Sequence, residues 1–254
     1  MERPILVAVL VFVLVFGGAL AGLTAGRWLP EHHQDADTRD AVKLVMGLIA
    51  TVSALVLSLL IASAHNSYNT QENEVQKLGA HIAELNQVLT SYGPEAAGVR
   101  VQLRRLGETE LARIWRHAGT APTSTLASAN LVHGEEMYQK LAALMPKDEA
   151  QRFAQTRALQ LATTMDGTRR LLYEQAGGSL SWPFFVVLVF WLVTLFIGFS
   201  LYARRNTTAI AAFFVGALTV AGAIFLILDL YRPYSGLMHI SSAPIRNALM
   251  QIGR

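Results

Sequence analysis

The chain has 254 residues, of which 52% are apolar and only 15% are charged, and its formal net charge is +3. This composition is typical of a membrane protein rather than a soluble domain. The sequence contains no cysteine, which excludes thiol catalysis, cysteine zinc sites and disulfide bonds.

Four uncharged stretches are each about 20 residues long, which is the length a helix needs to cross a bilayer. They run over residues 5–25, 44–64, 183–203 and 209–228. The first is longer than the apolar part of a signal peptide, and the "MER" before it has no net charge. We therefore predict four transmembrane helices, the first of them an anchor.

The first stretch contains a GxxxGxxxG pattern formed by Gly18, Gly22 and Gly26. Helices in lipid associate where small residues let their backbones approach closely. We expect this face to pack against another helix. The sequence leaves two partners open, a second copy of the chain or the second span of the same subunit.

The second stretch carries small or weakly polar residues along one helix face. These pore-lining candidates are Gly47, Thr51, Ala54, Ser58, Ala62 and His65. Such a face either packs against a neighbouring helix or lines a wet path through an oligomer. The spans contain no charged residue, which argues against an ion-coupled transporter.

The polar insert, residues 66–176, holds twelve Lys/Arg and twelve Asp/Glu residues. Balanced charge with regular apolar spacing predicts a helical bundle rather than a nucleic-acid-binding face. The first helix of the insert should continue the second span without a break and end at "YGP", residues 92–94. Its apolar face is predicted to comprise Val75, Leu78, Ile82, Leu85, Leu89 and Tyr92.

Three further helices are predicted in the insert, near residues 95–117, ahead of Pro146, and from Asp148 to the "GG" at 177–178. The predicted fold is an all-α membrane protein, with four transmembrane helices and a soluble helical bundle inserted between the second and third. The first two spans occupy residues 1–65, the bundle 66–176, the last two spans 177–230, and an interfacial elbow with a short helix 231–254.

The fourth span ends near Asp229, although a helix C-terminus disfavours a carboxylate. Because Pro233 disfavours helical geometry at the preceding residue, Arg232 can fold back over the end of the helix. We predict an interfacial ion pair between Asp229 and Arg232 with a structural role; a gating or ion-binding role for Asp229 is the alternative. The short helix after residue 242 should lie along the membrane or cap the bundle.

Catalytic and metal-binding patterns are missing from the sequence. It has no GxGxxG, GxxxxGK[ST], HExxH or GxSxG motif. The histidine pair in "EHH", residues 31–33, lacks a third ligand at useful spacing. We expect neither an enzyme nor a cofactor or metal site.

The segments "GLIATVSALVLSLLIASAHNSYNTQ" (47–71), "ARRNTTAIAA" (203–212) and "GAIFLILDLYRPYSGLMHISSAPIRNAL" (222–249) resemble the bacterial bestrophin-like domain family. The resemblance implies distant similarity to bestrophins, which are pentameric anion channels with four spans and a helical domain between the second and third. Bestrophins narrow their pore with aromatic residues in the second span, which this stripe lacks. Tyr231 also stands where the family has an acidic residue.

Two functions are therefore expected. The first is a homo-oligomeric anion channel in the lipid bilayer, lined by the second span; the alternative is a structural or sensing membrane protein whose bundle binds a partner or ligand. We expect the inner (cell) membrane of a bacterium. The short loops, residues 27–43 and 204–208, carry five Lys/Arg, which favours a periplasmic or extracellular bundle, whereas the analogy with bestrophins favours a cytosolic one.

Overall fold

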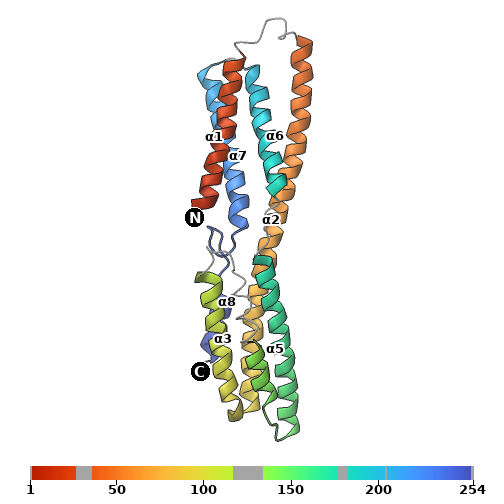
Figure 1. The fold of residues 1–254 in the computed structure, drawn as a ribbon, viewed down its shortest axis with the longest axis vertical. Coiled ribbons are helices and arrows are strands. Elements are labelled where there is room, and N and C mark those ends of the chain that lie inside the picture. Colours follow the sequence, from red (N-terminus) through yellow and green to blue (C-terminus); the bar gives the residue numbers. More distant parts are fainter. Residues whose placement is uncertain (1, 27–35, 117–133, 177–181, 204, 253–254) are drawn as a thin grey trace. The chain divides into compact units, whose positions relative to one another are not determined.

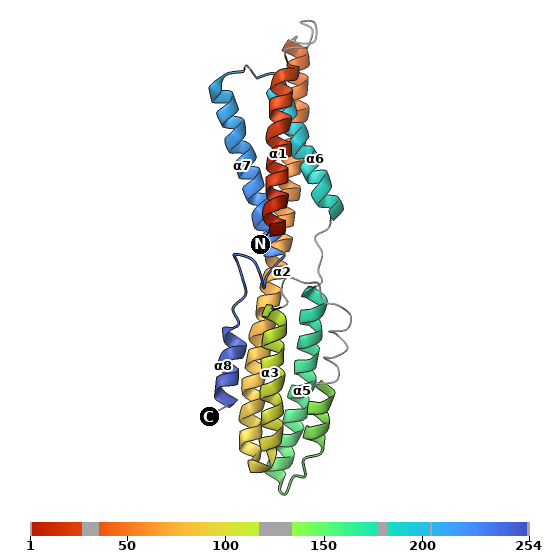
Figure 2. The same cartoon turned by 60° about the vertical axis from the view of Figure 1, so that its left-hand side comes forward.

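The computed structural model describes residues 2–26, 36–116, 134–176, 182–203 and 205–252. These residues form helices, turns and irregular segments and include no strand. The chain divides into two compact units, Met1–Asn66 with Ser179–Tyr231 and Ser67–Gly178 with Arg232–Arg254. The helices of both units are drawn in Figure 1 and Figure 2. The "EHH" segment lies outside the described residues.

The described residues include four helices long and apolar enough to cross a membrane. They are α1 (Glu2–Ala25), α2 (Ala36–Tyr92), α6 (Trp182–Leu201) and α7 (Thr207–Leu230). The sequence placed the three shorter ones within a few residues of these bounds. Asn206 begins α7, because its side-chain oxygen accepts a hydrogen bond from the Ala209 backbone N–H at 2.7 Å.

Helix α2 is continuous over 57 residues, which corresponds to about 85 Å. It contributes its first part to one unit and the remainder to the other, so the predicted continuation of the second span into the insert is confirmed. The helix begins at Ala36 rather than near Leu44. Arg39 and Lys43, which the sequence analysis assigned to a loop, therefore lie on its first turns.

In the first unit, α1 packs along both α6 and α7 (Figure 1). The side chains of Val11, Val15 and Ala19 on this helix are at most 2% exposed. Toward α7, the rings of Phe12 and Phe16 meet Phe214 edge-on, with centroids 5.5 and 5.6 Å apart. Such pairs add geometric specificity to a contact that apolar burial alone does not direct in lipid.

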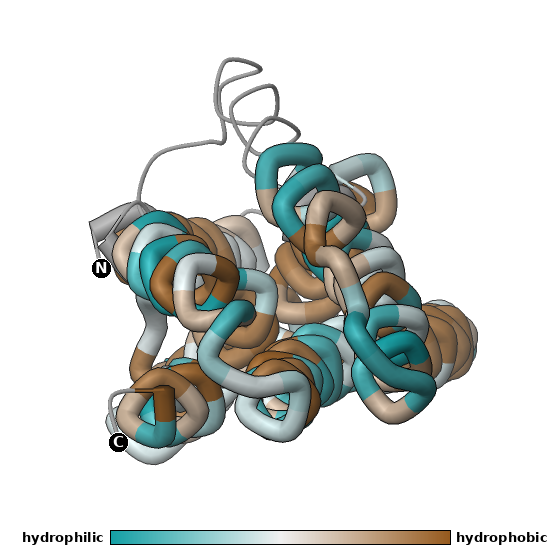
Figure 3. The backbone as a smooth tube through the Cα atoms, turned by 90° about the horizontal axis from the view of Figure 1, so that it is seen from below, coloured by the Kyte–Doolittle hydropathy of each residue, from teal (hydrophilic) through white to brown (hydrophobic). Residues whose placement is uncertain are grey.

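The second unit is built around one apolar core. It contains the later part of α2, α3 (Ala97–Arg116), a helical segment over residues 134–142, α5 (Glu149–Ala176) and α8 (Ala243–Ile252). Seen end-on, the helical tubes nearest the viewer carry both hydrophilic and hydrophobic positions (Figure 3). The predicted apolar face of α2 is fully buried in this core, through Val75, Leu78, Ile82, Leu85, Leu89 and Tyr92.

Local signals end and begin the helices of this unit. Gly93 follows α2 with a φ of 116°, a conformation that favours glycine, and a 3-10 turn over Pro94–Ala96 leads into α3. At the start of α5, the Asp148 carboxylate accepts a hydrogen bond from the Gln151 backbone N–H at 2.7 Å. The "YGP" and Asp148 boundaries read from the sequence are both confirmed.

Helix α8 packs on the core of this unit through Ile245, Ala248, Leu249 and Ile252. Two glycines make room for it, because a Cβ at Gly79 would lie 2.8 Å from the backbone of Pro244 and one at Gly107 would lie 2.5 Å from Leu249 Cδ2. The apolar face predicted for the short helix is therefore turned into the helical core.

The C-terminal end of α8 receives two side-chain donors. Arg100 Nη2 lies 3.4 Å from the Ile252 carbonyl, and Asn86 Nδ2 lies 3.4 Å from the Gln251 carbonyl. Arg100 Nε also donates to Asn86 Oδ1 at 3.0 Å. A cation at a helix C-terminus satisfies orphan carbonyls and complements the helix dipole.

A buried ion pair joins α3 to α5. Arg169 Nε donates to Glu110 Oε1 at 3.1 Å, and the two side chains are only 4% and 2% exposed. Both residues occupy positions of apolar stripes, Glu110 four residues after Leu106 and Arg169 four residues after Met165. The pair is satisfied only when the two helices are in one register.

We expect Arg169→Ala to destabilise the protein by about 3–5 kcal/mol, because it removes the buried guanidinium that donates to the Glu110 carboxylate. Replacing both Glu110 and Arg169 by Met should recover most of that loss. The control is Arg104→Ala, which removes an ion pair to Glu108 with 52% and 55% exposed side chains and should cost less than about 1 kcal/mol. Thermal unfolding in one detergent measures all three; equal losses for Arg169→Ala and Arg104→Ala would contradict the assignment.

Candidate functional site

The membrane-spanning part of α2 has three different sides. One side packs within the unit and includes the buried residues Ser53, Leu60 and Ala64. A second side bears large apolar residues that stay exposed, among them Leu55 and Leu59 at 66% and 68%. At 100° per residue these sides lie more than a third of a turn apart, which leaves a third side between them.

The third side is the stripe predicted from the sequence. All six of its residues are exposed in the single chain: Gly47, Thr51, Ala54, Ser58, Ala62 and His65. The Thr51 hydroxyl donates to the Gly47 carbonyl one turn back, at 2.9 Å. The Thr51 hydroxyl is thus hydrogen-bonded within its own helix. The described part of the chain leaves the stripe uncovered from end to end.

The glycine face of α1 lies against α6. A Cβ at Gly22 would clash with Ser200 Oγ and lie 2.6 Å from the Ile197 carbonyl oxygen, and one at Gly18 would lie 3.2 Å from Ile197 Cγ1. A Cβ at Gly26 would clash with the Leu201 carbonyl. The three glycines therefore allow α1 to reach the backbone of the third span, which is neither of the two partners expected from the sequence.

Asp229 is buried at the end of α7, with 3% of its surface exposed. The helix closes there, as the Tyr231 N–H donates to the Ile227 carbonyl at 3.3 Å. Asp229 belongs to the first unit and Arg232 to the second. The ion pair between these two residues remains a prediction.

The segment after Arg232 forms an ordered elbow in the second unit. The Arg232 carbonyl accepts from the Ser235 and Gly236 N–H groups at 3.2 and 3.1 Å, and the Pro233 carbonyl accepts from Ile240 at 2.7 Å. Trp115 Nε1 on α3 donates to the Ile240 carbonyl at 3.0 Å.

Trp115 also meets the ring of Tyr234 edge-on, with centroids 5.8 Å apart. Burial raises the pKa of the Tyr234 hydroxyl well above its ordinary value. Tyr234 thus stays neutral over the physiological range, and the elbow is held on α3 by a neutral aromatic contact together with the Trp115 hydrogen bond.

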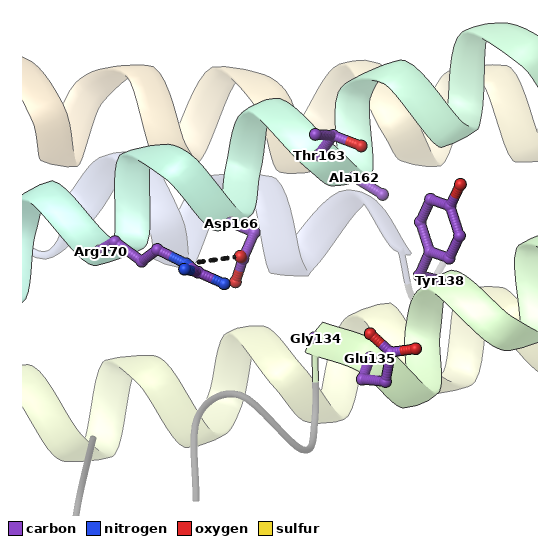
Figure 4. Close-up of a pocket in the computed structure, with 7 residues that line it drawn as sticks. All are labelled: Gly134, Glu135, Tyr138, Ala162, Thr163, Asp166 and Arg170. Atoms are coloured by element: carbon purple, nitrogen blue, oxygen red, sulfur yellow. Dashed lines mark hydrogen bonds and ion pairs between the residues drawn. The ribbon is translucent and has the colours of Figure 1, made fainter. Parts of the chain in front are cut away.

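A groove of about 420 Å³ lies between the helical segment 134–142 and α5. Figure 4 shows Ala162, Thr163, Asp166 and Arg170 on α5, with Glu135 and Tyr138 on the opposite segment. Arg170 Nε donates to Asp166 Oδ2 at 2.8 Å. The groove thus offers carboxylates, a guanidinium and an aromatic ring, a set suited to a small polar solute or a peptide. The described residues contain no group of three or more His, Cys, Asp or Glu placed to hold a metal ion.

The sequence and the fold were compared with known families and solved structures. The family model described as "Bestrophin-like domain" matches residues 12–245. The chain belongs to the Bestrophin-like domain family. A crystal structure of a membrane protein has the same fold as this bestrophin-like chain, with a TM-score of 0.67, 12% sequence identity, and coverage of 97% of this chain and 99% of that chain. A search of curated proteins gives no match.

Several features of this bestrophin-like chain escaped the sequence analysis. The Glu110–Arg169 pair is signalled by charged residues at apolar stripe positions, a pattern that can be searched for. The groove of Figure 4 lies between two consecutive helices, and the periodicity of neither helix predicts it. The partner of the glycine face is likewise undetermined locally, because a small face fits any helix that can come close.

The glycine contact predicts different outcomes for neighbouring glycines. Gly22→Ala should destabilise the protein by about 1–3 kcal/mol, because the added methyl group meets the backbone of α6. Gly17→Ala is the matched control, since a Cβ there meets nothing within 4 Å, and we expect it to be neutral or slightly stabilising. Thermal unfolding in one detergent compares the two; equal melting temperatures would show that the α1–α6 approach does not limit stability.

Proposed function

We propose that this protein is a homo-oligomeric ion channel in which the stripe of α2 from Gly47 to His65 lines the conducting path. The observation that carries the proposal is the exposure of this stripe in the single chain, between a packed side and a bulky apolar side. Hydroxyl and small side chains gain little from facing lipid, whereas a ring of copies turns them toward a shared axis.

The chemistry of the stripe fits a weakly selective or hydrophobically gated path. Thr51 and Ser58 supply hydroxyls, Ala54 and Ala62 supply small apolar surfaces, and His65 is its most polar member. Rings of small apolar side chains gate by excluding water, and hydroxyls lower the cost of partial dehydration of an ion. Anions are the proposed cargo because bestrophins, which the sequence resembles, conduct anions.

The second unit is proposed to be a soluble bundle outside the bilayer. Its segment 66–176 is rich in balanced charge, whereas the most apolar helical windows fall in the spans. We propose no catalytic role and no bound cofactor for either unit.

A flux assay with paired substitutions tests the channel. Ala54→Phe should lower ion flux in proteoliposomes on the order of tenfold or more, because a ring of added aromatic groups narrows the path. Leu55→Phe, which places the same aromatic ring on the proposed lipid-facing side, should leave the flux near that of the native chain. Proteoliposomes that stay impermeable to chloride, potassium and protons across a pH series would refute the proposal.

The groove between residues 134–142 and α5 favours a second candidate, a sensing protein whose bundle binds a small polar ligand or a peptide. A groove of about 420 Å³ with charged walls is large enough for such a ligand. This candidate gains weight if tight proteoliposomes coincide with ligand-dependent stabilisation that Asp166→Asn abolishes. Flux that responds to Ala54→Phe excludes it as the sole function.

The proposed orientation places the bundle in the periplasm or cell exterior, with the protein in the inner (cell) membrane of a bacterium. Arg39 and Lys43 lie near the start of α2, and Arg205 lies between α6 and α7. Basic residues in or near short loops favour the cytoplasmic side. Reporter fusions after Ala176 should be active only outside the cytoplasm. Activity of a cytoplasmic reporter at the same position would reverse the orientation.

A further inference from the structure

A groove of about 240 Å³ opens between the first turns of α2 and the C-terminal end of α6. Both walls belong to the first unit, so the groove is a feature of the membrane-spanning helices alone. It combines two basic side chains at one end with an apolar wall toward the helix interiors. The residues of its mouth differ from those of the α2 stripe.

Arg39 is fixed at the polar end of the groove. Its Nη2 donates to the Tyr202 carbonyl at 3.2 Å, and its guanidinium carbon lies 5.9 Å from the centroid of the Tyr202 ring. A guanidinium has five N–H donors, and this bond uses one of them. The side chain is therefore oriented by α6 and retains donors that suit a phosphate oxygen.

Lys43 supplies the second cation, one turn further along α2. Its ammonium lies 2.8 Å from Asp40 Oδ1, in a pair whose side chains are 56% and 69% exposed. An exposed pair of this kind is weak and leaves the ammonium accessible to another anion. Arg39 and Lys43 both line the groove, whereas Asp40 does not.

The remaining wall is apolar and runs toward the centre of the spans. Met46 and Val42 line it from α2, and Gly198 and Phe199 line it from α6. A Cβ at Gly198 would lie 2.5 Å from Met46 Sδ, so the two helices approach closely below the groove. Phe199 is 47% exposed and offers an aromatic surface to an alkyl chain.

We propose that this groove holds one molecule of an anionic phospholipid. Its phosphate is bound by Arg39 and Lys43, and one acyl chain lies on the Met46 and Phe199 side. The position suits this ligand, because the ends of two spans meet the headgroup region and Tyr202 has the amphipathic character of interfacial aromatic residues. Basic pockets between spans select anionic headgroups over neutral ones. A free phosphate ion shares the polar chemistry but makes no use of the apolar wall.

Native mass spectrometry of the full-length protein in neutral detergent tests the proposal, with phosphatidylglycerol, phosphatidylcholine and inorganic phosphate as probes. We expect tighter binding of phosphatidylglycerol than of phosphatidylcholine. Arg39→Gln and Lys43→Gln should each weaken phosphatidylglycerol binding about fivefold. The matched control is Arg205→Gln, an exposed basic residue beside the end of α6 that does not line the groove, and it should bind like the native chain.

Equal losses in Arg39→Gln and Arg205→Gln would overturn the site, as would equal binding of the two lipids. Inorganic phosphate that displaces phosphatidylglycerol at millimolar concentration would assign the groove to a free anion and overturn the lipid. Arg39→Lys retains the charge and should lie between native and Arg39→Gln. If Arg39→Gln does not fold, Lys43→Gln, whose pair with Asp40 is exposed, gives the same test.

Discussion

Burial of apolar surface gives two helices in a bilayer almost no net driving force to associate. The packing of the spans in this protein therefore depends on how closely their backbones can approach. Gly18, Gly22 and Gly26 supply that approach, because α1 reaches the α6 backbone at Ile197 only where α1 lacks side chains. The aromatic contacts of Phe12 and Phe16 with Phe214 fix α7 beside the same helix.

This packing has a consequence for α2. Gly198 of α6 receives Met46, and the buried positions of α2 fall on that same side, including Ser53, Leu60 and Ala64. The remaining two sides stay exposed in the single chain, one bulky and apolar and one small and weakly polar. Lipid is an adequate solvent for the first side. The small, weakly polar side is stabilised more by contact with other copies of the chain or with water than by contact with lipid. This difference is the physical basis of the proposed channel.

The sequence predicted well what depends on periodicity. The apolar spacing from Val75 to Tyr92 became the buried face of α2, the "YGP" turn ended that helix at Tyr92, and Ile245 to Ile252 became the buried face of α8. These features depend on the residues of one helix and on local turn chemistry. The bestrophin-like resemblance, carried by residues 47–71, 203–212 and 222–249, agrees with the matched family.

Contacts between separate helices could not be predicted from the sequence. The residues around Gly22 do not identify α6 as its partner. Those around Glu110 do not identify Arg169, which lies 59 positions away. The groove lined by Arg39 and Lys43 could not be predicted for another reason. Arg39 and Lys43 were assigned to a loop, where two basic residues define no surface, whereas on α2 they stand one turn apart and face the end of α6.

The most direct test of the central claim is the reactivity of single cysteines on α2 in the assembled, membrane-embedded protein, which the absence of native cysteine makes possible. A water-soluble thiol reagent should modify cysteines at Thr51, Ser58 and His65, because the stripe faces a wet path. Cysteines at Val52 and Leu59, on the lipid-facing side, should stay protected. Equal protection at all five positions would show that the stripe is dry and would contradict the account.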